Sequence, residues 1–407
     1  MHKKLLATLL ITCSFSSLAM AGGYQLQEYS VVNLGRAFGG AGVAGDDYSA
    51  VAFNPAGMTL KNTGLQIGSS LISIRAHGNG NLRSAANPDT IVGGGKGKLS
   101  TTALLPHFFG QIKAGDRLRI GGGVYVPFGL GTYYKKNWFG ATHALNSEIT
   151  AIDTALAAAY QVTDTISVGA SAFLEYAEAR LTSKIPMSNN YSDLNADNWK
   201  PGYSVGVMYQ PQKETRLGVA YRSKVHHNLK GPHYFGPLTG DCGTSLTFPE
   251  HVLISGYQEI GKWGLSAIAR WTRWSHFNKL NLHSEAFRHY AGTPNLPTVD
   301  ENWRNVWTVG AGVDYHYNTN WTYRTGLAID QGAVKQATNR TARVPDSNRI
   351  QASLGFSYTK NNWQIDASYM HLFWKTASSY NTVSGTILDA KYRVHTDILG
   401  VGLQYHF

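Results

Sequence analysis

Residues 22–60 read GGYQLQEYSVVNLGRAFGGAGVAGDDYSAVAFNPAGMTL. This stretch shows none of the strict alternation that marks a strand, and it carries the acidic pair Asp46-Asp47, the tripeptide Asn54-Pro55-Ala56 and clustered glycines at Gly35, Gly39, Gly40, Gly42 and Gly45. Glycine permits tight turns and close approach of one backbone to another. We therefore expect residues 22–62 to form a small plug inside a larger structure built by residues 63–407.

Residues 1–21 have the pattern of a secretory signal peptide. A basic start (His2, Lys3 and Lys4) leads into an apolar run that is too short to span a bilayer as a helix. Ala19-Met20-Ala21 is a small-x-small cleavage site. We predict cleavage after Ala21 and export of the mature chain.

The composition excludes several classes of protein. Cys13 leaves with the signal, so Cys242 stands alone and neither an intramolecular disulfide nor a multi-cysteine metal site is expected. The net charge of +11 becomes +9 once Lys3 and Lys4 are removed, and no compact basic run indicates nucleic-acid binding. The diffuse basic excess fits either solvated loops or attraction of anionic lipid or substrate.

The remaining chain alternates with period two. In the last segment Leu399, Val401 and Leu403 alternate with Gly400, Gly402 and Gln404. Large apolar residues on one face and small or polar ones on the other are what a transmembrane barrel requires, and a closed barrel leaves no strand edge unpaired in lipid. The 44 glycines and 12% aromatic content agree with this fold. We predict an all-β, antiparallel transmembrane β-barrel of about fourteen strands.

The predicted strands are separated by connections that alternate in length. The strands cover residues 63–75, 100–113, 118–133, 148–161, 165–183, 199–210, 216–228, 246–259, 263–277, 305–317, 321–330, 349–358, 363–374 and 395–407. Outer-membrane barrels have short periplasmic turns and long external loops. An even strand number then places both ends of the chain in the periplasm, with the plug entering the barrel from that side. Terminal Phe407 resembles the signal that barrel-assembly machinery reads.

The plug resembles the amino-terminal hatch of the FadL family of outer-membrane long-chain fatty acid transporters. The resemblance rests on Gly23-Tyr24-Gln25-Leu26, Leu34-Gly35-Arg36-Ala37, Asp46-Asp47 and Asn54-Pro55-Ala56. It continues along the barrel at Val126-Pro127-Phe128-Gly129-Leu130, Tyr221-Arg222-Ser223-Lys224, Trp274-Ser275-His276-Phe277, residues 320–326, Val344-Pro345-Asp346 with Arg349, and Tyr369-Met370-His371.

The resemblance implies a plugged barrel in the Gram-negative outer membrane that takes up hydrophobic molecules passively. Substrate would enter from outside, reach a pocket probed by Tyr24, and leave sideways into the membrane through a wall opening. Asn54-Pro55-Ala56 would seat the hatch against the wall. Proline removes a ladder hydrogen bond from a strand, so Pro127, Phe128, Gly129 and Gly131 are the predicted site of the opening.

The substrate is less well defined than the fold. A fatty acid needs an apolar tunnel with a cation near its carboxylate, and Arg222, Arg324 and Arg349 are strand candidates. The commoner role for such arginines is pairing with a lumen carboxylate, for which Asp314 and Asp330 are available. Where relatives carry a headgroup-binding Arg, this chain has Ser183 beside Lys184; where they carry a Lys, it has Asn281, with Lys279 nearby. Aromatic hydrocarbons such as toluene or xylene are therefore an alternative substrate class.

The sequence fits two further classes of protein less well, an outer-membrane hydrolase and a polar porin. An outer-membrane hydrolase would need a catalytic group assembled at the barrel rim. No HExxH motif is present, and Gly202-Tyr203-Ser204-Val205-Gly206, which matches GxSxG in its letters, lies within a predicted strand and not at the strand-to-helix turn of a nucleophile elbow. A simple polar porin has no obvious use for the plug. We expect a non-enzymatic monomer that binds no cofactor or metal and contacts outer-membrane lipid.

Overall fold

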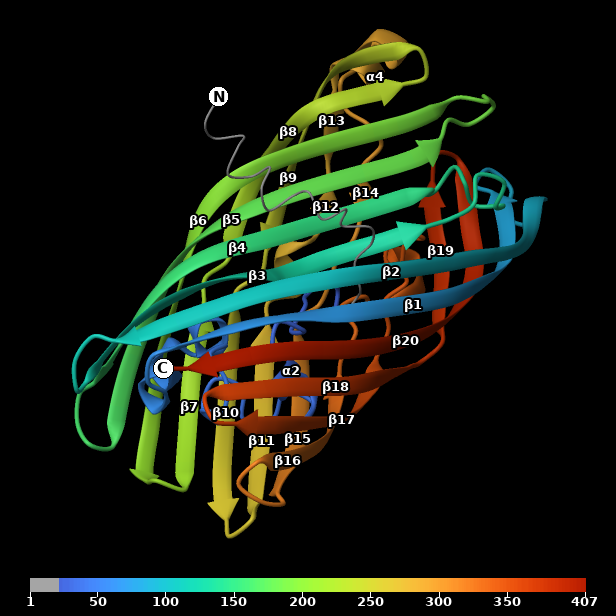
Figure 1. Ribbon diagram of the computed structural model, residues 1–407. Coiled ribbons are helices and arrows are strands. Elements are labelled where there is room, and N and C mark those ends of the chain that lie inside the picture. Colours follow the sequence, from blue (N-terminus) through green and yellow to red (C-terminus); the bar gives the residue numbers. More distant parts are fainter. Residues whose placement is uncertain (1–21) are drawn as a thin grey trace.

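The computed structural model describes residues 22–407; the predicted signal peptide and Cys13 lie outside the described residues. Fourteen antiparallel strands close into a barrel (Figure 1), which confirms the predicted fold class. In order round the wall they are β1 (Gly64–Ser84), β2 (Ile91–Lys113), β3 (Leu118–Tyr133), β4 (Asn146–Gln161), β5 (Ile166–Lys184), β6 (Tyr191–Gln212), β7 (Thr215–Arg222), β10 (His251–Ile260), β11 (Trp263–Thr272), β15 (Val306–His316), β16 (Trp321–Asp330), β17 (Arg349–Lys360), β18 (Trp363–Trp374) and β20 (Thr386–His406). Pairing of β1 with β20 closes the sheet.

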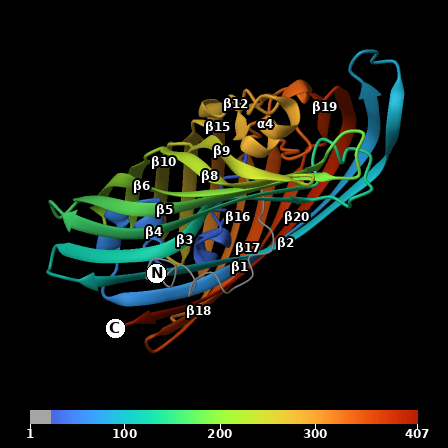
Figure 2. The ribbon, with the colours of Figure 1, turned by 90° about the horizontal axis from the view of Figure 1, so that it is seen from above.

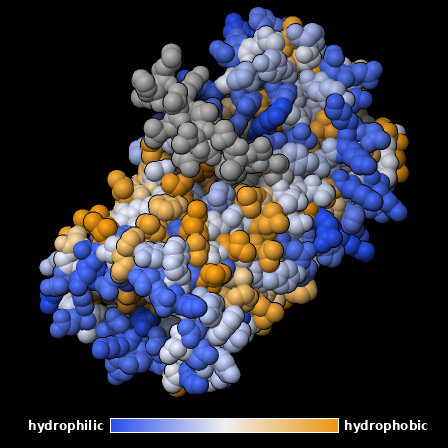
Figure 3. Space-filling view, viewed as in Figure 1, coloured by the Kyte–Doolittle hydropathy of each residue, from blue (hydrophilic) through white to orange (hydrophobic). Residues whose placement is uncertain are grey.

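The strands alternate as a membrane wall requires. Leu399 and Val401 expose 52% and 57% of their surface, whereas Gly400 between them is buried. Apolar side chains form a band across the middle of the wall, with hydrophilic residues towards both ends (Figure 3). Aromatic pairs such as Trp363–Tyr405, 4.6 Å between ring centroids, lie near the short-turn end, where interfacial aromatic girdles are found. Within residues 22–407 no helix has the length and apolar character to cross a bilayer.

The two ends of the barrel differ. Turns of two to four residues join the strands at one end, where the Phe407 amide also donates to the Thr63 carbonyl at 3.1 Å. The opposite end carries the longer connections, including α4 (Figure 1). These connections contain β8 (Val225–Phe235), β9 (Leu238–Phe248), η2 (Trp274–His276), β12 (Lys279–Leu280), β13 (Leu282–Ser284), α4 (Glu285–Ala291), β14 (Val299–Asp300), η3 (Ala337–Asn339) and β19 (Ala377–Val383).

Several predicted element boundaries were wrong. Residues 77–98, 229–245 and 376–394 were expected to be loops, but most of each segment is paired strand. Beyond the bilayer both faces of a strand meet water, so the alternation disappears while the backbone ladder continues. The predicted strand 216–228 breaks between β7 and β8, and residues preceding β10 belong to β9. Pro249 separates β9 from β10, because it has no amide hydrogen to donate to a ladder.

Residues 22–60 lie within the barrel and are almost all buried (Figure 2). They form α2 (Val31–Leu34), α3 (Ala50–Phe53) and η1 (Pro55–Leu60). We call residues 22–62 the plug. Its hydrogen bonds reach strands all round the wall, involving Ser70 of β1, Gln111 of β2, Val207 of β6, Asp314 of β15 and Ser368 of β18.

A buried ionic cluster fixes the centre of the plug to the wall. The Arg36 guanidinium lies 2.7 Å from Asp46 of the plug and 2.8 Å from Asp314 of β15. Arg324 of β16 lies 3.1 Å from the same Asp46, so two cations face two carboxylates. Gly326 allows this approach, because a Cβ there would stand 2.3 Å from the Arg36 carbonyl oxygen.

The exchange Arg36→Met should lower the free energy of unfolding by about 3–5 kcal/mol, because it removes one of the two cations that face Asp46 and the fully buried Asp314. Thermal unfolding in detergent measures the loss. The control Arg75→Met removes an exposed pair with Asp397 and should cost at most about 1 kcal/mol. Equal losses in the two variants would contradict the role of the cluster.

Candidate functional site: a wall defect beneath two cavities

The wall contains one long interruption in backbone pairing between β2 and β3. The ladder between them runs from Lys113↔Arg119 to Phe108↔Val124 and then stops, apart from a single bridge at Leu99↔Tyr134. On its other side β3 pairs with β4 but shifts register between Tyr125 and Phe128. In this bulge two residues of β3, Val126 and Pro127, stand opposite one residue of β4, Ile152. The predicted kink region therefore coincides with the place where β2 and β3 separate.

The start of the plug pairs with the exposed edge of β3. The Leu26 amide donates to the Pro127 carbonyl, and the Gly129 amide donates to the Tyr24 carbonyl, each at 2.8 Å. Between these bonds Gln25 and Phe128 form an antiparallel bridge. Unpaired backbone groups are costly in lipid, so this short plug strand satisfies polar groups that β2 leaves free.

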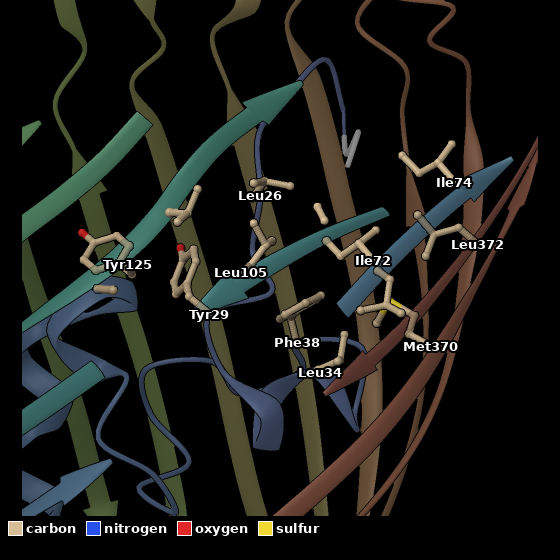
Figure 4. Close-up of a cluster of buried hydrophobic side chains, with 14 of the residues drawn as sticks. Leu26, Tyr29, Leu34, Phe38, Ile72, Ile74, Leu105, Tyr125, Met370 and Leu372 are labelled. Carbon is tan, nitrogen blue, oxygen red and sulfur yellow. The ribbon is translucent and has the colours of Figure 1, made fainter. Parts of the chain in front are cut away.

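Plug side chains fill the same interruption. Leu26 and Tyr29 are buried beside Leu105 of β2 and Tyr125 of β3 (Figure 4). The Tyr29 and Tyr125 rings lie 4.9 Å apart, and Tyr29 stacks on Phe53 at 4.7 Å. The defect in the wall is therefore closed by apolar packing and two backbone hydrogen bonds that all come from the plug.

An apolar inner cavity of about 40 Å³ lies beside this seal. A volume of this size holds one or a few waters, so a larger ligand would have to displace side chains. Tyr24 is buried at its floor, 4.6 Å from Trp274 and 5.4 Å from Trp303 between ring centroids. Phe128, Phe248 and Phe277 complete this aromatic group. Of the aromatic group, Tyr24 and Phe277 line the cavity itself. The other lining residues are Leu130, Ile149, Ala179, Leu181, Leu229, Thr244, Leu246, Leu280, Glu301, Arg343 and Val344.

Glu301 and Arg343 are the charged residues of the inner cavity. Arg343 donates to the Ser147 hydroxyl at 2.9 Å and forms no ion pair with any carboxylate in the described part of the chain. Burial lowers its pKa to about 10, which leaves it cationic at neutral pH. Glu301 accepts a hydrogen bond from Trp303 Nε1 at 2.9 Å. Burial raises the pKa of Glu301 to about 7, against the opposing effects of Trp303 and Arg343.

An outer cavity of about 90 Å³ lies among the long connections. It shares Leu280, Glu301 and Arg343 with the inner cavity. Thr142, His143 and Ser183 also line it. Burial lowers the pKa of His143 to about 4, so this side chain is neutral at physiological pH. The outer cavity, the inner cavity and the wall defect are thus adjacent to one another in that order. Glu301 and Arg343 line both cavities, and we call the place between the cavities the neck.

The structure places the other sequence-predicted cations outside both cavities. Arg349 pairs with Asp330 at 2.5 Å and Asp346 at 3.1 Å. Arg222 pairs with Asp153 and Glu175 of the lumen, and Arg324 belongs to the ionic cluster. Lys279 is exposed, 3.8 Å from Asp300. Lys184 lines a separate surface depression.

Asn54-Pro55-Ala56 lies near the carboxyl end of the plug segment, whereas Tyr24 lies near its amino end. The Asn54 side chain accepts from the Ala56 amide at 3.1 Å and donates to the Val207 carbonyl of β6 at 3.2 Å. Pro55 is the first residue of η1, a position that needs no amide donor. One asparagine therefore caps a helix and joins the plug to the wall.

The sequence analysis missed Arg343 and Glu301. Both lie in irregular connections, where no alternation assigns a side chain to the lumen. The available signal was weak: Arg343 directly precedes Val344-Pro345-Asp346, one of the motifs that carried the family resemblance.

His233 lies between two serine hydroxyls, an arrangement that bears on the hydrolase alternative. His233 lies 2.8 Å from the Ser192 hydroxyl and 2.6 Å from the Ser284 hydroxyl. In the triad geometry a carboxylate orients the imidazole, whereas here the second ring nitrogen meets Ser284, which also caps α4. We therefore interpret Ser192, His233 and Ser284 as structural contacts between the long connections.

Fold and site together define a transport-type barrel whose wall defect is sealed by its own amino-terminal segment. The chain belongs to the outer membrane protein transport family (OMPP1/FadL/TodX), whose sequence profile matches residues 12–407. A putative outer membrane protein of Neisseria meningitidis serogroup B is 29% identical, with 98% of each chain covered. The long-chain fatty acid transport protein of Escherichia coli O6:H1 is 26% identical, with 88% of each chain covered.

Solved structures show the same fold. The crystal structure of a Pseudomonas aeruginosa FadL homologue has a TM-score of 0.85 at 24% identity, covering 95% of this chain and 100% of the other. The Ralstonia pickettii toluene transporter TbuX has a TM-score of 0.70 at 19% identity, covering 94% and 99%. The chain is thus an outer-membrane hydrophobic-substrate channel of this family.

Glu301→Gln should stabilise the protein at alkaline pH. The pKa of Glu301 is about 7 in the folded protein and about 4.3 in an unfolded chain. Ionisation therefore costs stability as the pH rises through 7, and this cost is absent below about pH 4. We expect the variant to gain about 3–4 kcal/mol more at about pH 8.5 than at about pH 4, measured by thermal unfolding.

Glu285→Gln is the matched control, since Glu285 is an exposed residue of α4 that pairs with Arg288. It should leave the pH dependence of unfolding unchanged. If Glu301→Gln behaves in the same way, Glu301 is not a buried, perturbed carboxyl.

Proposed function

We propose that this protein takes up long-chain fatty acids passively across the outer membrane. The observation that carries the proposal is the Arg343 guanidinium, which has no carboxylate partner among residues 22–407 and lines a mostly apolar cavity that adjoins a sealed defect in the wall. A cation without a carboxylate partner beside apolar walls suits an alkyl chain that ends in a carboxylate. Relatives named long-chain fatty acid transport protein support this substrate class.

The proposed route follows the order of the cavities. A fatty acid is captured among the long connections, passes Glu301 and Arg343, and enters the inner cavity by displacing the aromatic group around Tyr24. Movement of residues 24–26 then frees the edge of β3, and the alkyl chain leaves between β2 and β3 into the bilayer. The predicted external entry requires both chain ends to be periplasmic.

Aromatic hydrocarbons are the second candidate substrates. The aromatic group around Tyr24 offers ring faces and edges to a small planar ligand, and the inner cavity is small. The solved toluene transporter TbuX shares the fold. A neutral ligand of this kind would have no use for Arg343, so the two candidates differ in their response to loss of that cation.

Arg343→Met should weaken binding of decanoate at least about tenfold, because it removes the charge-assisted hydrogen bonds to the carboxylate. Binding of decan-1-ol, which has the same chain length and no charge, should change less than about threefold. Calorimetry on the purified protein in detergent measures both. The control Lys279→Met removes an exposed cation and should alter neither.

Equal decanoate affinity in Arg343→Met and wild type would contradict recognition of the carboxylate by Arg343. Binding of toluene by a wild-type protein that ignores decanoate would assign the site to aromatic hydrocarbons.

A disulfide across the seal should block uptake while sparing external capture. Gln25 and Phe128 face each other in the plug–β3 bridge, and directly opposed residues in an antiparallel pair lie within disulfide range. We expect Gln25→Cys with Phe128→Cys, in a Cys242→Ser background, to abolish fatty acid uptake into cells when oxidised. Uptake should return on reduction. Unchanged uptake by the oxidised protein would rule out exit past residues 24–26.

A further inference from the structure

Glu301 and Arg343 form an unusual pair at the neck of the two cavities. Both line the inner and the outer cavity, yet their charged groups form no ion pair. Each is held by another partner: Glu301 by the indole of Trp303 at 2.9 Å, and Arg343 by the Ser147 hydroxyl at 2.9 Å. Glu301 is only 3% exposed. A carboxylate and a guanidinium thus line the same two cavities without an ion pair between them.

We propose that this neck binds the fatty acid together with one proton, so that the ligand carboxylate is shared between the Arg343 guanidinium and a protonated Glu301. Arg343 donates N–H to one ligand oxygen, and the Glu301 carboxyl donates O–H to the other. Arg343 then sets the preference for acids over neutral amphiphiles, and Glu301 makes that preference depend on pH. This inference rests on the proposed fatty acid uptake and adds its proton stoichiometry.

The charge balance of the neck carries the argument. Arg343 with an ionised Glu301 sums to zero, so an incoming carboxylate would leave one uncompensated negative charge next to apolar walls. Two carboxylates that share a buried site cannot both stay ionised at low cost, and one of them takes a proton. With that proton the complex is neutral, and all three polar groups are hydrogen-bonded. Burial has already raised the pKa of Glu301 to about 7, so the proton is readily taken up at neutral pH.

Three other titratable residues of the two cavities, Tyr24, His143 and Arg343, do not titrate near pH 7. Burial raises the pKa of Tyr24, on the plug, well above its usual value. The pKa of His143, in the connection after β3, is lowered to about 4. Arg343, in the connection after β16, has a pKa of about 10. Lys279 and Asp300 of β12 and β14 are about 60% exposed and face solvent as a pair. A change between about pH 6 and 8.5 therefore reports on Glu301.

The test compares decanoate with decan-1-ol across this pH range by calorimetry. In the wild type the Kd for decanoate should stay constant below about pH 7 and rise about tenfold per unit above it, because one proton must then be supplied. The Kd for decan-1-ol should not change. In Glu301→Gln the Kd for decanoate should be independent of pH and at least about tenfold lower than that of wild type at about pH 8.5. Glu285→Gln should follow the wild type.

A measurement on the wild type alone guards against a misfolded variant. Binding heats in buffers of different ionisation enthalpy, at about pH 8, should report uptake of about one proton per decanoate and none for decan-1-ol. Decanoate binding without proton uptake and with a constant Kd would overturn the inference but leave fatty acid uptake standing. Failure to bind decanoate at any pH would overturn the inference and the fatty acid proposal together.

Discussion

The structure depends on one constraint: a barrel wall in lipid cannot leave backbone polar groups unpaired. Pro127 and the bulge at Tyr125–Phe128 separate β3 from β2, and that separation exposes part of an edge. The plug meets the constraint by lending residues 24–26 as a short extra strand. The chain thus replaces a permanent strand pairing with one made by a segment that belongs to the lumen.

The plug divides into a part that is held by ion pairs and a part that is uncharged. Around Arg36, four charged groups from the plug and from β15 and β16 meet in a buried cluster. Residues 24–26, which seal β3, carry no charge. They are held by two backbone hydrogen bonds, by packing of Tyr24 and Leu26, and by hydrogen bonds of the Gln25 side chain to His251 and Thr272. On the proposed route residues 24–26 move while the ion pairs around Arg36 stay in place.

The uncharged part of the plug also forms part of the inner cavity. The floor of the inner cavity is Tyr24, whose carbonyl is one of the groups that seal β3. A ligand that displaces the Tyr24 ring thus acts on the backbone of the seal without any intermediate element. Arg343 and Glu301 also line this cavity, and on the proposed route they meet the polar end of a ligand.

Much of the fold could be predicted from the sequence, because a strand in lipid must carry apolar residues on its outer face and alternate them with small or polar ones. Leu399 and Val401 against Gly400 and Gly402 marked a spanning strand, and such patterns gave the barrel and its fourteen strands. Pro127 marked the break in β3, since proline cannot donate to a ladder. Beyond the bilayer this alternation rule no longer applies, so the sequence predicts loops across β19 and across most of β8 and β9. Arg343 could not be placed for the same reason: its position depends on how an irregular connection folds over the cavity.

Hydrogen–deuterium exchange at the amides of Leu26 and Gly129 tests the account most directly. These two amides make the hydrogen bonds of the seal. On addition of decanoate to the protein in lipid nanodiscs, both should exchange faster, while amides of the β3–β4 ladder such as Ala155 and those around Arg36 keep their protection. Unchanged protection at Leu26 and Gly129 with decanoate bound would show that ligand binding does not open the seal, and would contradict the account.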